Sequence, residues 1–270
     1  MSPRLLSLAV PTALALGAVL VPIPAASAAP GPSTTTTVDA TAFAPPRTGR
    51  ATLSVPRRVE AGKPFTVSGR APLKTRVTIQ ALQGRKWVAV RPSVGVSRNG
   101  TYSASVRLTK AGSVTLRAVA TGPTPATSSG VRTAVFAWFD VAATEPTLTY
   151  NVRYGGAVPV NGRVYPLSIA QDYCGSRGSS AAWNVNRVCT TLRTTVGVRD
   201  DDSSAAVGRV EVWADDAIVI DEPVRFGASK AMSVDISGAL RLTFVTYRTE
   251  TYVRPVFGRP QILCSRNPFE

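Results

Sequence analysis

NGTYSASVRL, residues 99–108, places an apolar side chain at every second position from Tyr102 to Leu108. The positions between them carry Ser or Arg. Side chains of a β-strand alternate between the two faces of a sheet, so this pattern predicts a strand with one buried and one solvated face. A second run, Val114 to Ala118, repeats the alternation, and we expect it to pair with the first. Asn99-Gly100 favours a tight turn before the first strand, because both residues tolerate positive φ.

The same alternation extends over residues 50–122, where Gly and Pro interrupt it at short intervals and no helical period is present. Short alternating strands separated by turn residues are typical of a β-sandwich. The stretch Gly62-Lys63-Pro64-Phe65-Thr66-Val67-Ser68-Gly69 resembles bacterial immunoglobulin-like repeats of secreted proteins. This resemblance implies an immunoglobulin-like first domain.

The first residues have the three-part pattern of a secretion signal peptide, expected to cover residues 1–28. Arg4 supplies the charge, Leu5 to Val21 is apolar, and Ala26-Ser27-Ala28 is a small-residue cleavage site. Residues 29–49 are rich in Pro, Ser, Thr and Ala and are expected to form a disordered linker. No later segment is apolar and long enough to cross a bilayer. We therefore expect a secreted protein, extracellular or associated with the cell envelope.

Gly, Pro, Thr and Ser dominate again near residues 123–129, which we interpret as a second linker before a domain covering residues 130–268. Strand patterns resume beyond it and predict a second sandwich of jelly-roll type. The expected strands are 134–141, 184–198, 210–213, 218–220, 232–236, 240–246 and 261–264. The fold class expected for the whole chain is therefore all-β, with two β-sandwich domains.

Three motifs of the second half are similar to the NPCBM family of carbohydrate-binding modules: Thr194-Thr195-Val196-Gly197-Val198-Arg199-Asp200-Asp201, Val210-Glu211-Val212-Trp213-Ala214-Asp215-Asp216 and Val234-Asp235-Ile236-Ser237-Gly238-Ala239-Leu240-Arg241-Leu242. The resemblance implies a jelly-roll domain that binds carbohydrate and leaves catalysis to other proteins. Residues 246–260 depart from the family, which usually carries an acidic and aromatic segment there, often with a histidine, in a loop associated with sugar binding.

Sugar recognition needs an aromatic face for the pyranose ring and planar polar groups for its hydroxyls. The departing loop supplies both kinds, in Tyr247, Arg248, Glu250, Tyr252 and Arg254. The alternative is an ordinary solvated loop. Trp183 is a second candidate platform, although a core position suits so large a side chain better. Trp213 alternates with Val210 and Val212, which is compatible with an outward-facing ring, but we favour its interpretation as a cross-strand packing partner.

Histidine is absent from the chain, which removes the commonest general base and the commonest metal ligand. We therefore expect no enzyme activity and no metal centre of zinc type. The run Asp200-Asp201-Asp202 could hold calcium through carboxylate oxygens, but a solvated turn is the more common role of such a run. A glycosidase pair among Asp200, Asp235 and Glu250 is disfavoured, because nothing in the sequence sets two of them face to face.

The chain has three cysteines, and export to an oxidising compartment predicts one disulfide with three possible pairings. We favour Cys174 with Cys264, because the first and last strands of such sandwiches tend to lie near each other. Cys189 would then be free.

Positive charge is concentrated in the first domain. Residues 50–122 carry fourteen Lys or Arg against Glu60 alone, whereas residues 130–270 carry fifteen against fourteen acids. Such a field attracts anionic polymers, or it merely keeps the surface soluble. A specific nucleic-acid reader is disfavoured, because only Trp87 and Tyr102 accompany the basic residues. The expected function is non-catalytic binding of carbohydrate or cell-wall polysaccharide by a monomer, and the alternative is an envelope protein that binds anionic polymer or protein partners.

Overall fold

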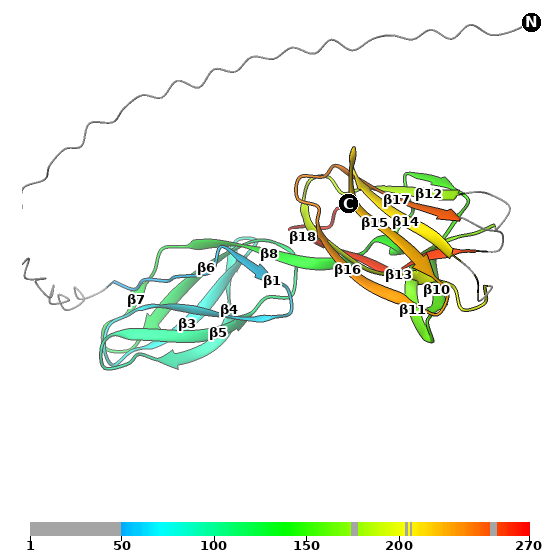
Figure 1. Ribbon diagram of the computed structural model, residues 1–270. Coiled ribbons are helices and arrows are strands. Elements are labelled where there is room, and N and C mark those ends of the chain that lie inside the picture. The colour runs from blue at the N-terminus through cyan, green and yellow to red at the C-terminus, as the bar shows by residue number, and fades with distance from the viewer. Residues whose placement is uncertain (1–49, 174–177, 203–204, 206, 249–252) are drawn as a thin grey trace, which may run out of the picture. The chain divides into compact units, whose positions relative to one another are not determined.

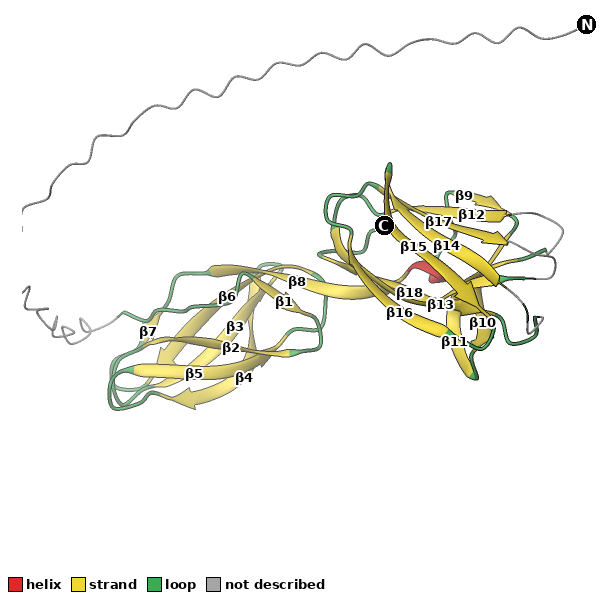
Figure 2. Cartoon of the chain, viewed as in Figure 1, coloured by secondary structure: helices red, strands yellow, loops and turns green. Residues whose placement is uncertain are grey.

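The computed structural model describes residues 50–173, 178–202, 205, 207–248 and 253–270. Within these residues the chain folds almost entirely into β-strands, joined by one short 3-10 helix, η1 (Val141–Ala143) (Figures 1 and 2). The all-β fold class is confirmed. In the part that the structure describes, no helix is long and apolar enough to cross a membrane. The expected signal peptide and the linker at 29–49 lie outside the described residues.

The first β-sandwich is built from two sheets around one apolar core. Its strands are β1 (Arg58–Glu60), β2 (Pro64–Arg70), β3 (Arg76–Gln83), β4 (Lys86–Gly95), β5 (Thr101–Arg107), β6 (Gly112–Thr121), β7 (Ala126–Thr127) and the first half of β8 (Val131–Asp140). One sheet has the order β4-β3-β6-β8, with β1 parallel to β8 and β7 beside β6. Strands β2 and β5 form the facing sheet.

The alternation of residues 102–108 correctly identifies the buried face of β5, but the expected partner strand is wrong. Tyr102 and Val106 are buried as predicted. However, β5 pairs with β2, whereas β6 pairs with β3 and β8. The two strands meet through their side chains instead, and Val106 and Leu116 belong to the same core. Alternation in a sequence reveals which face of a strand is buried. It does not tell whether two such strands are hydrogen-bonded neighbours in one sheet or lie in opposite sheets of the sandwich.

Strand β8 runs unbroken through the expected start of the second domain. Its first half, from Val131 to Val135, pairs with β6, and its second half, from Ala137 to Asp140, pairs with β18. The expected linker at 123–129 contains β7, which is part of the first sheet. Pairing with the first sandwich thus ends inside β8, near Phe136, and not at 123–129.

The second β-sandwich consists of two sheets that face each other. One sheet is five-stranded and has the order β15-β14-β17-β12-β9. The other has the order β10-β11-β18, with β13 paired to β18 and β16 paired to β13. Most connections cross from one sheet to the other, as in a jelly roll (Figure 2). Its strands are β9 (Leu148–Tyr150), β10 (Val152–Val160), β11 (Arg163–Gln171), β12 (Gly178–Asn184), β13 (Cys189–Val198), β14 (Val207–Ala214), β15 (Ala217–Arg225), β16 (Ser229–Asp235), β17 (Arg241–Arg248) and β18 (Pro255–Cys264).

Aromatic rings connect the two sheets across the second core. Trp183 on β12 contacts Phe244 on β17 edge to face, with ring centroids 5.6 Å apart. Phe244 in turn contacts Phe257 on β18 of the opposite sheet at 5.1 Å. All three side chains are buried. Edge-to-face contacts add to the large apolar area that such rings remove from water, so this row fixes the spacing of the sheets.

One disulfide joins Cys189 to Cys264, which corrects the expected pairing of Cys174 with Cys264. Strands β13 and β18 are antiparallel neighbours, and their register sets the two cysteines directly opposite each other, with Cα atoms 3.9 Å apart. The expectation assumed that the first and last strands of the domain would be linked, whereas β13 is a middle strand of the sequence. Cys174 lies outside the described residues.

Candidate functional site

Tyr247 is near the end of β17 and points away from the core of the second sandwich. Its neighbour Thr246 is buried, while Tyr247 is 40 % exposed, as the alternation of the strand requires. On the adjacent strand β12 the opposite residue is Gly178. A Cβ atom there would lie 3.5 Å from the tyrosine ring, so the ring lies against bare backbone. The sheet therefore displays an aromatic ring near the end of its central strand.

Glu211 holds this ring together with a second one. It is on β14, beside β17, and its Oε2 atom accepts hydrogen bonds from Trp213 Nε1 at 3.0 Å and from the Tyr247 hydroxyl at 3.5 Å. Arg209 pairs with Glu211 on one side and with Asp221 on the other. Burial raises the pKa of Tyr247, and the charge of Glu211 raises it further. The phenol thus remains a neutral hydrogen-bond donor at physiological pH.

Tyr150 extends this surface to the far edge of the sheet. It is 62 % exposed on β9 and lies in one cross-strand row with Ser180, Val245 and Glu211. Three strand spacings, about 14 Å, separate the ends of that row. We call the outward surface of Tyr150, Trp213 and Tyr247, with Glu211 between the latter two, the aromatic face. A flat surface of rings and polar groups can contact several sugar units at once.

Of the other loop residues expected to bind sugar, Arg254 already has partners within the protein. Its guanidinium forms ion pairs with Asp201 at 3.1 Å and Asp202 at 2.7 Å, and its backbone N–H donates to Asp202. Arg248 is half-buried at the end of β17. Arg254 therefore anchors the loop to the acidic run. The remaining two, Glu250 and Tyr252, lie outside the described residues.

Trp183 is a core residue, which corrects its assignment as a binding platform. It is 1 % exposed and packs against Tyr154 and Phe244. Its Nε1 atom donates to the carbonyl oxygen of Thr144 at 3.0 Å. A ring that is buried this deeply offers no face for a sugar to stack on.

The acidic run 200–202 is occupied by donors of the protein. Asp200 accepts the backbone N–H groups of Asn161 and Gly162, at 2.6 and 2.9 Å. Asp201 and Asp202 bind Arg254, and Asp201 also binds Arg199. Calcium at this run remains a prediction, and the ion would have to replace these contacts.

Sequence reasoning missed the partners of Tyr247 on the aromatic face. It interpreted Trp213 as a packing partner, whereas Trp213 is half-buried on the outer surface, opposite a bulge in β15. The alternation Val210-Glu211-Val212-Trp213 sets Glu211 and Trp213 on one face; it made an outward Trp213 an alternative from the sequence, and it could have revealed Glu211 as well. Tyr150 carried no such signal, since it joins the surface only through the order of the strands.

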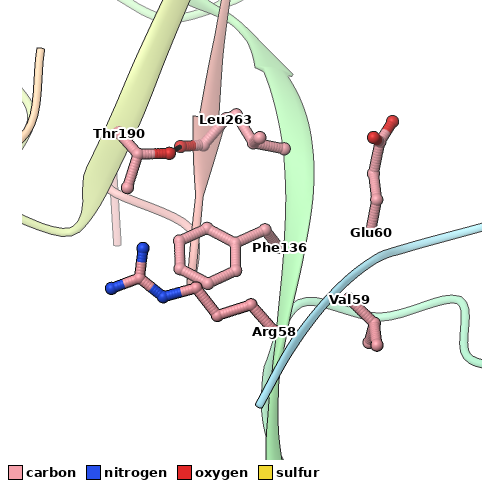
Figure 3. Close-up of a pocket in the computed structure, with 6 residues that line it drawn as sticks. All are labelled: Arg58, Val59, Glu60, Phe136, Thr190 and Leu263. Carbon is pink, nitrogen blue, oxygen red and sulfur yellow. Dashed lines mark hydrogen bonds between the residues drawn. The ribbon is translucent and has the colours of Figure 1, made fainter. Parts of the chain in front are cut away.

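A separate pocket of about 270 Å³ lies beside β1 and β8 (Figure 3). The guanidinium of Arg58 lies 5.6 Å from the centre of the Phe136 ring, while Glu60 points away from both. Glu60 is engaged elsewhere, with Lys63 and Trp138. The pocket gathers none of the residues expected from sequence to bind a ligand.

Comparison with known proteins adds family information to the second sandwich. Residues 175–254 match the family model described as the NPCBM/NEW2 domain. No curated protein matches the chain. The matched segment contains Glu211, Trp213 and Tyr247.

Several solved structures share a limited structural likeness. A CBM51 module of Clostridium perfringens GH95, in complex with methyl-galactose, is 16% identical with a TM-score of 0.39 and covers 46% of this chain and 99% of that module. Tandem CBM51 modules of Sp3GH98 from Streptococcus pneumoniae are 11% identical with a TM-score of 0.41, covering 74% and 81%.

The CBM51-2 and INT domains of ZmpB from C. perfringens are 13% identical with a TM-score of 0.40 and cover 57% of this chain. The chain spans 38% of the length of that ZmpB structure. Independently of these structures, residues 175–254 in the C-terminal part of the chain match the model of the NPCBM/NEW2 domain.

Proposed function

We propose that the protein is a secreted, non-catalytic binder of carbohydrate and that its second sandwich holds the ligand on the aromatic face. The observation that carries this proposal is the position of Tyr247, an exposed ring within the NPCBM/NEW2 match, with its hydroxyl 3.5 Å from the Glu211 carboxylate. A sugar ring packs its apolar C–H face on such a ring, and its hydroxyls bond to the polar groups at the rim.

Preorganisation supports binding at this surface. Trp213 and Tyr247 share one carboxylate, so their rings lose little conformational freedom when a ligand arrives. Arg209 and Asp221 surround that carboxylate with further donors and acceptors. Because these rings are spread over neighbouring strands, the surface suits a chain of sugars better than a single enclosed sugar.

The absence of histidine and the roles of the carboxylates support a non-catalytic protein. Asp200 accepts two backbone N–H groups, and Asp235 accepts the N–H of Ser237 in a turn. Glycoside hydrolysis needs two carboxyl groups that face each other across the bond. Glu250, the third candidate, lies outside the described residues.

Export is supported by the signal-like pattern of residues 1–28 and by the Cys189–Cys264 bond, since disulfides persist mainly in oxidising compartments. Mass spectrometry of the protein recovered from culture medium tests it. An N-terminus near Ala29 is expected, and retention of residues 1–28 in the cytoplasm would contradict export.

A pull-down on a panel of insoluble polysaccharides tests the binding itself. The purified protein should be retained on at least one polymer, and Tyr247→Ala should lose most of this retention. Leu73→Ala is the matched control, because Leu73 is a similarly exposed apolar residue in the first sandwich. Equal retention of both variants, or no retention of the unchanged protein, would contradict the proposal.

A second function is favoured by the charge of the first sandwich, which would bind anionic envelope polymer. Residues 50–122 carry fourteen Lys or Arg against the single acid Glu60, which pairs with Lys63 at 2.8 Å. The double variant Arg85→Gln/Lys86→Gln removes two exposed charges from the β3–β4 turn. It should weaken binding of the whole protein to dextran sulfate, and affinity should fall steeply as salt rises. Salt-independent binding would exclude this electrostatic account.

A further inference from the structure

A groove of about 260 Å³ crosses the outer side of β11, β13, β16 and β18, on the sheet opposite the aromatic face. Three arginines from three different strands reach it: Arg163, Arg193 and Arg259. All three are exposed. Tyr165 and Gln261 also line it, and we call this site the arginine groove.

The central guanidinium is fixed in place from two sides. Arg193 stacks on the indole ring of Trp138, with 3.9 Å from its Cζ atom to the ring centre. Its Nε and Nη2 atoms donate to Gln261 Oε1 at 3.0 and 2.8 Å. The N–H groups of a guanidinium lie in one plane, so those of Arg193 that do not bind Gln261 have a fixed direction. This planar geometry matches the oxygens of a carboxylate or phosphate group.

The bulge in β18 brings a second arginine to the groove. The register between β13 and β18 shifts between Arg193 and Thr195, and Arg259 in the extra stretch has a positive φ of 45°. Its Nε atom donates to Asp140 at 3.1 Å. Bulges commonly redirect side chains beside binding sites. This one places the side chain of Arg259 in the groove, and the backbone of Arg259 adopts an unfavourable conformation there.

An aromatic ring forms part of the floor. A Cβ atom at Gly258 would lie 2.8 Å from Tyr165 Cγ, so the absence of a side chain there lets the ring lie on β18. The Arg163 guanidinium lies 5.2 Å from the centre of that ring. The groove thus combines an aromatic surface with cations, as recognition of a charged sugar requires.

Charge in the arginine groove is not balanced internally. Arg259 is paired with Asp140, whereas Arg163 and Arg193 form no ion pair with any carboxylate of the described residues. Glu60 lies near enough to feel the charge of Arg193, but Lys63 and Trp138 already bind it. The exposed Arg163 and the fixed guanidinium of Arg193 therefore remain available to an anion from solution.

We propose that the arginine groove binds an acidic sugar residue, with Arg163 and Arg193 contacting its anionic group and Tyr165 contacting its ring. This is a second ligand site, on the other sheet from the aromatic face, and it does not depend on the function proposed for that face. A carboxylate of a uronic acid and a phosphate ester on a neutral sugar both present the required oxygens.

Microscale thermophoresis of the purified protein with three trisaccharides tests this site. The probes are a galacturonic acid trisaccharide, its carboxyl-reduced galactose counterpart, and that galactose trisaccharide carrying one phosphate. At least one acidic probe should bind about tenfold more tightly than the neutral one, and the tighter of the two identifies the anionic group. Equal affinity for the neutral and acidic probes, or binding of neither acidic probe, would overturn the proposal.

Variants distinguish the groove from general attraction to a basic protein. Arg163→Gln and Arg193→Gln should each weaken binding of the acidic trisaccharide about tenfold. Arg266→Gln removes the same charge from an exposed position outside the groove and should leave affinity unchanged. If Arg193→Gln fails to fold, Arg163→Gln still tests the site. The Arg163 side chain is exposed at the start of β11, so its replacement should leave the fold intact. Equal affinities of Arg163→Gln and Arg266→Gln would contradict the site.

Tyr247→Ala separates the two sites. It should abolish retention on neutral polysaccharide while acidic trisaccharides still bind. If neutral retention is absent in every variant but the acidic probes respond to Arg163→Gln, the arginine groove stands and the function proposed for the aromatic face fails.

Discussion

Residue type alone misleads at Trp183 and Trp213, which have opposite roles. Trp183 lies on the inner face of β12 and is enclosed in the core, while Trp213 lies on the outer surface and is held by Glu211. Both were candidates for a binding platform or for packing on the basis of sequence. What separates them is the face of the strand on which each one lies, and this depends on register rather than on composition.

Replacing Trp183 by Ala should lower the free energy of unfolding by about 3–5 kcal/mol, because the change leaves a cavity and removes the bond to Thr144. Thermal unfolding followed by circular dichroism measures this effect. A variant with unchanged stability but lost carbohydrate binding would mean that Trp183 acts as a platform after all.

Asp201 should contribute stability that disappears in acid. Burial alone would raise the pKa of this carboxyl group, but hydrogen bonding and charge from Arg199, with the charge of Arg254, outweigh burial and lower it below 3.8. The ionised group therefore stabilises the folded state above about pH 4, and this contribution is lost as pH falls through the depressed pKa.

The difference in melting temperature between the unchanged protein and Asp201→Asn should accordingly be larger at pH 7 than at pH 3. Asp216→Asn is a suitable control, since it removes an exposed carboxylate in the β14–β15 turn. A difference that is the same at both pH values would exclude the electrostatic explanation.

At the scale of strands, alternation predicted most of the second sandwich and failed where turn residues interrupt it. Strands β13, β14, β16 and β17 fall on expected segments, whereas β9 to β11 were missed. Gly155-Gly156, Pro159 and Pro166 obscure the period there, and β10 pairs with β11 through two register shifts. Irregular strands of this kind are held by their neighbours and leave little local signal.

Strand order also decides how much of the sites sequence could predict. Tyr247 could be predicted from the sequence, because it is an aromatic residue in the segment 246–260, which departs from the NPCBM family pattern. The arginine groove is not, since Arg163, Arg193 and Arg259 are far apart in sequence and meet only because β11, β18 and β13 are adjacent.

The bond between β13 and β18 should stabilise the second sandwich. Cys189→Ser should lower the free energy of unfolding by about 2–5 kcal/mol, since the bond closes a loop with a sequence separation of 75. Denaturant titration measures the loss. Cys174→Ser leaves the Cys189–Cys264 bond intact and serves as control, and a larger effect of Cys174→Ser would argue for the other pairing.

At the scale of the molecule, the two halves offer different surfaces. The first sandwich is strongly cationic, whereas the second is nearly neutral overall and gathers three of its arginines in one groove. A polymer that contains both neutral and acidic sugars could contact all these surfaces together. Multiple weak contacts on one polymer then raise the overall avidity without any enclosed pocket.

Isothermal titration calorimetry with a soluble oligosaccharide of the best-retained polymer tests the central claim, because it records binding and turnover in one trace. We expect heats that saturate and return to baseline, and an affinity at least about tenfold lower for Tyr247→Ala than for Leu73→Ala. A steady heat flow that persists after each injection and vanishes on replacing a carboxylate, or an affinity unchanged by Tyr247→Ala, would contradict it.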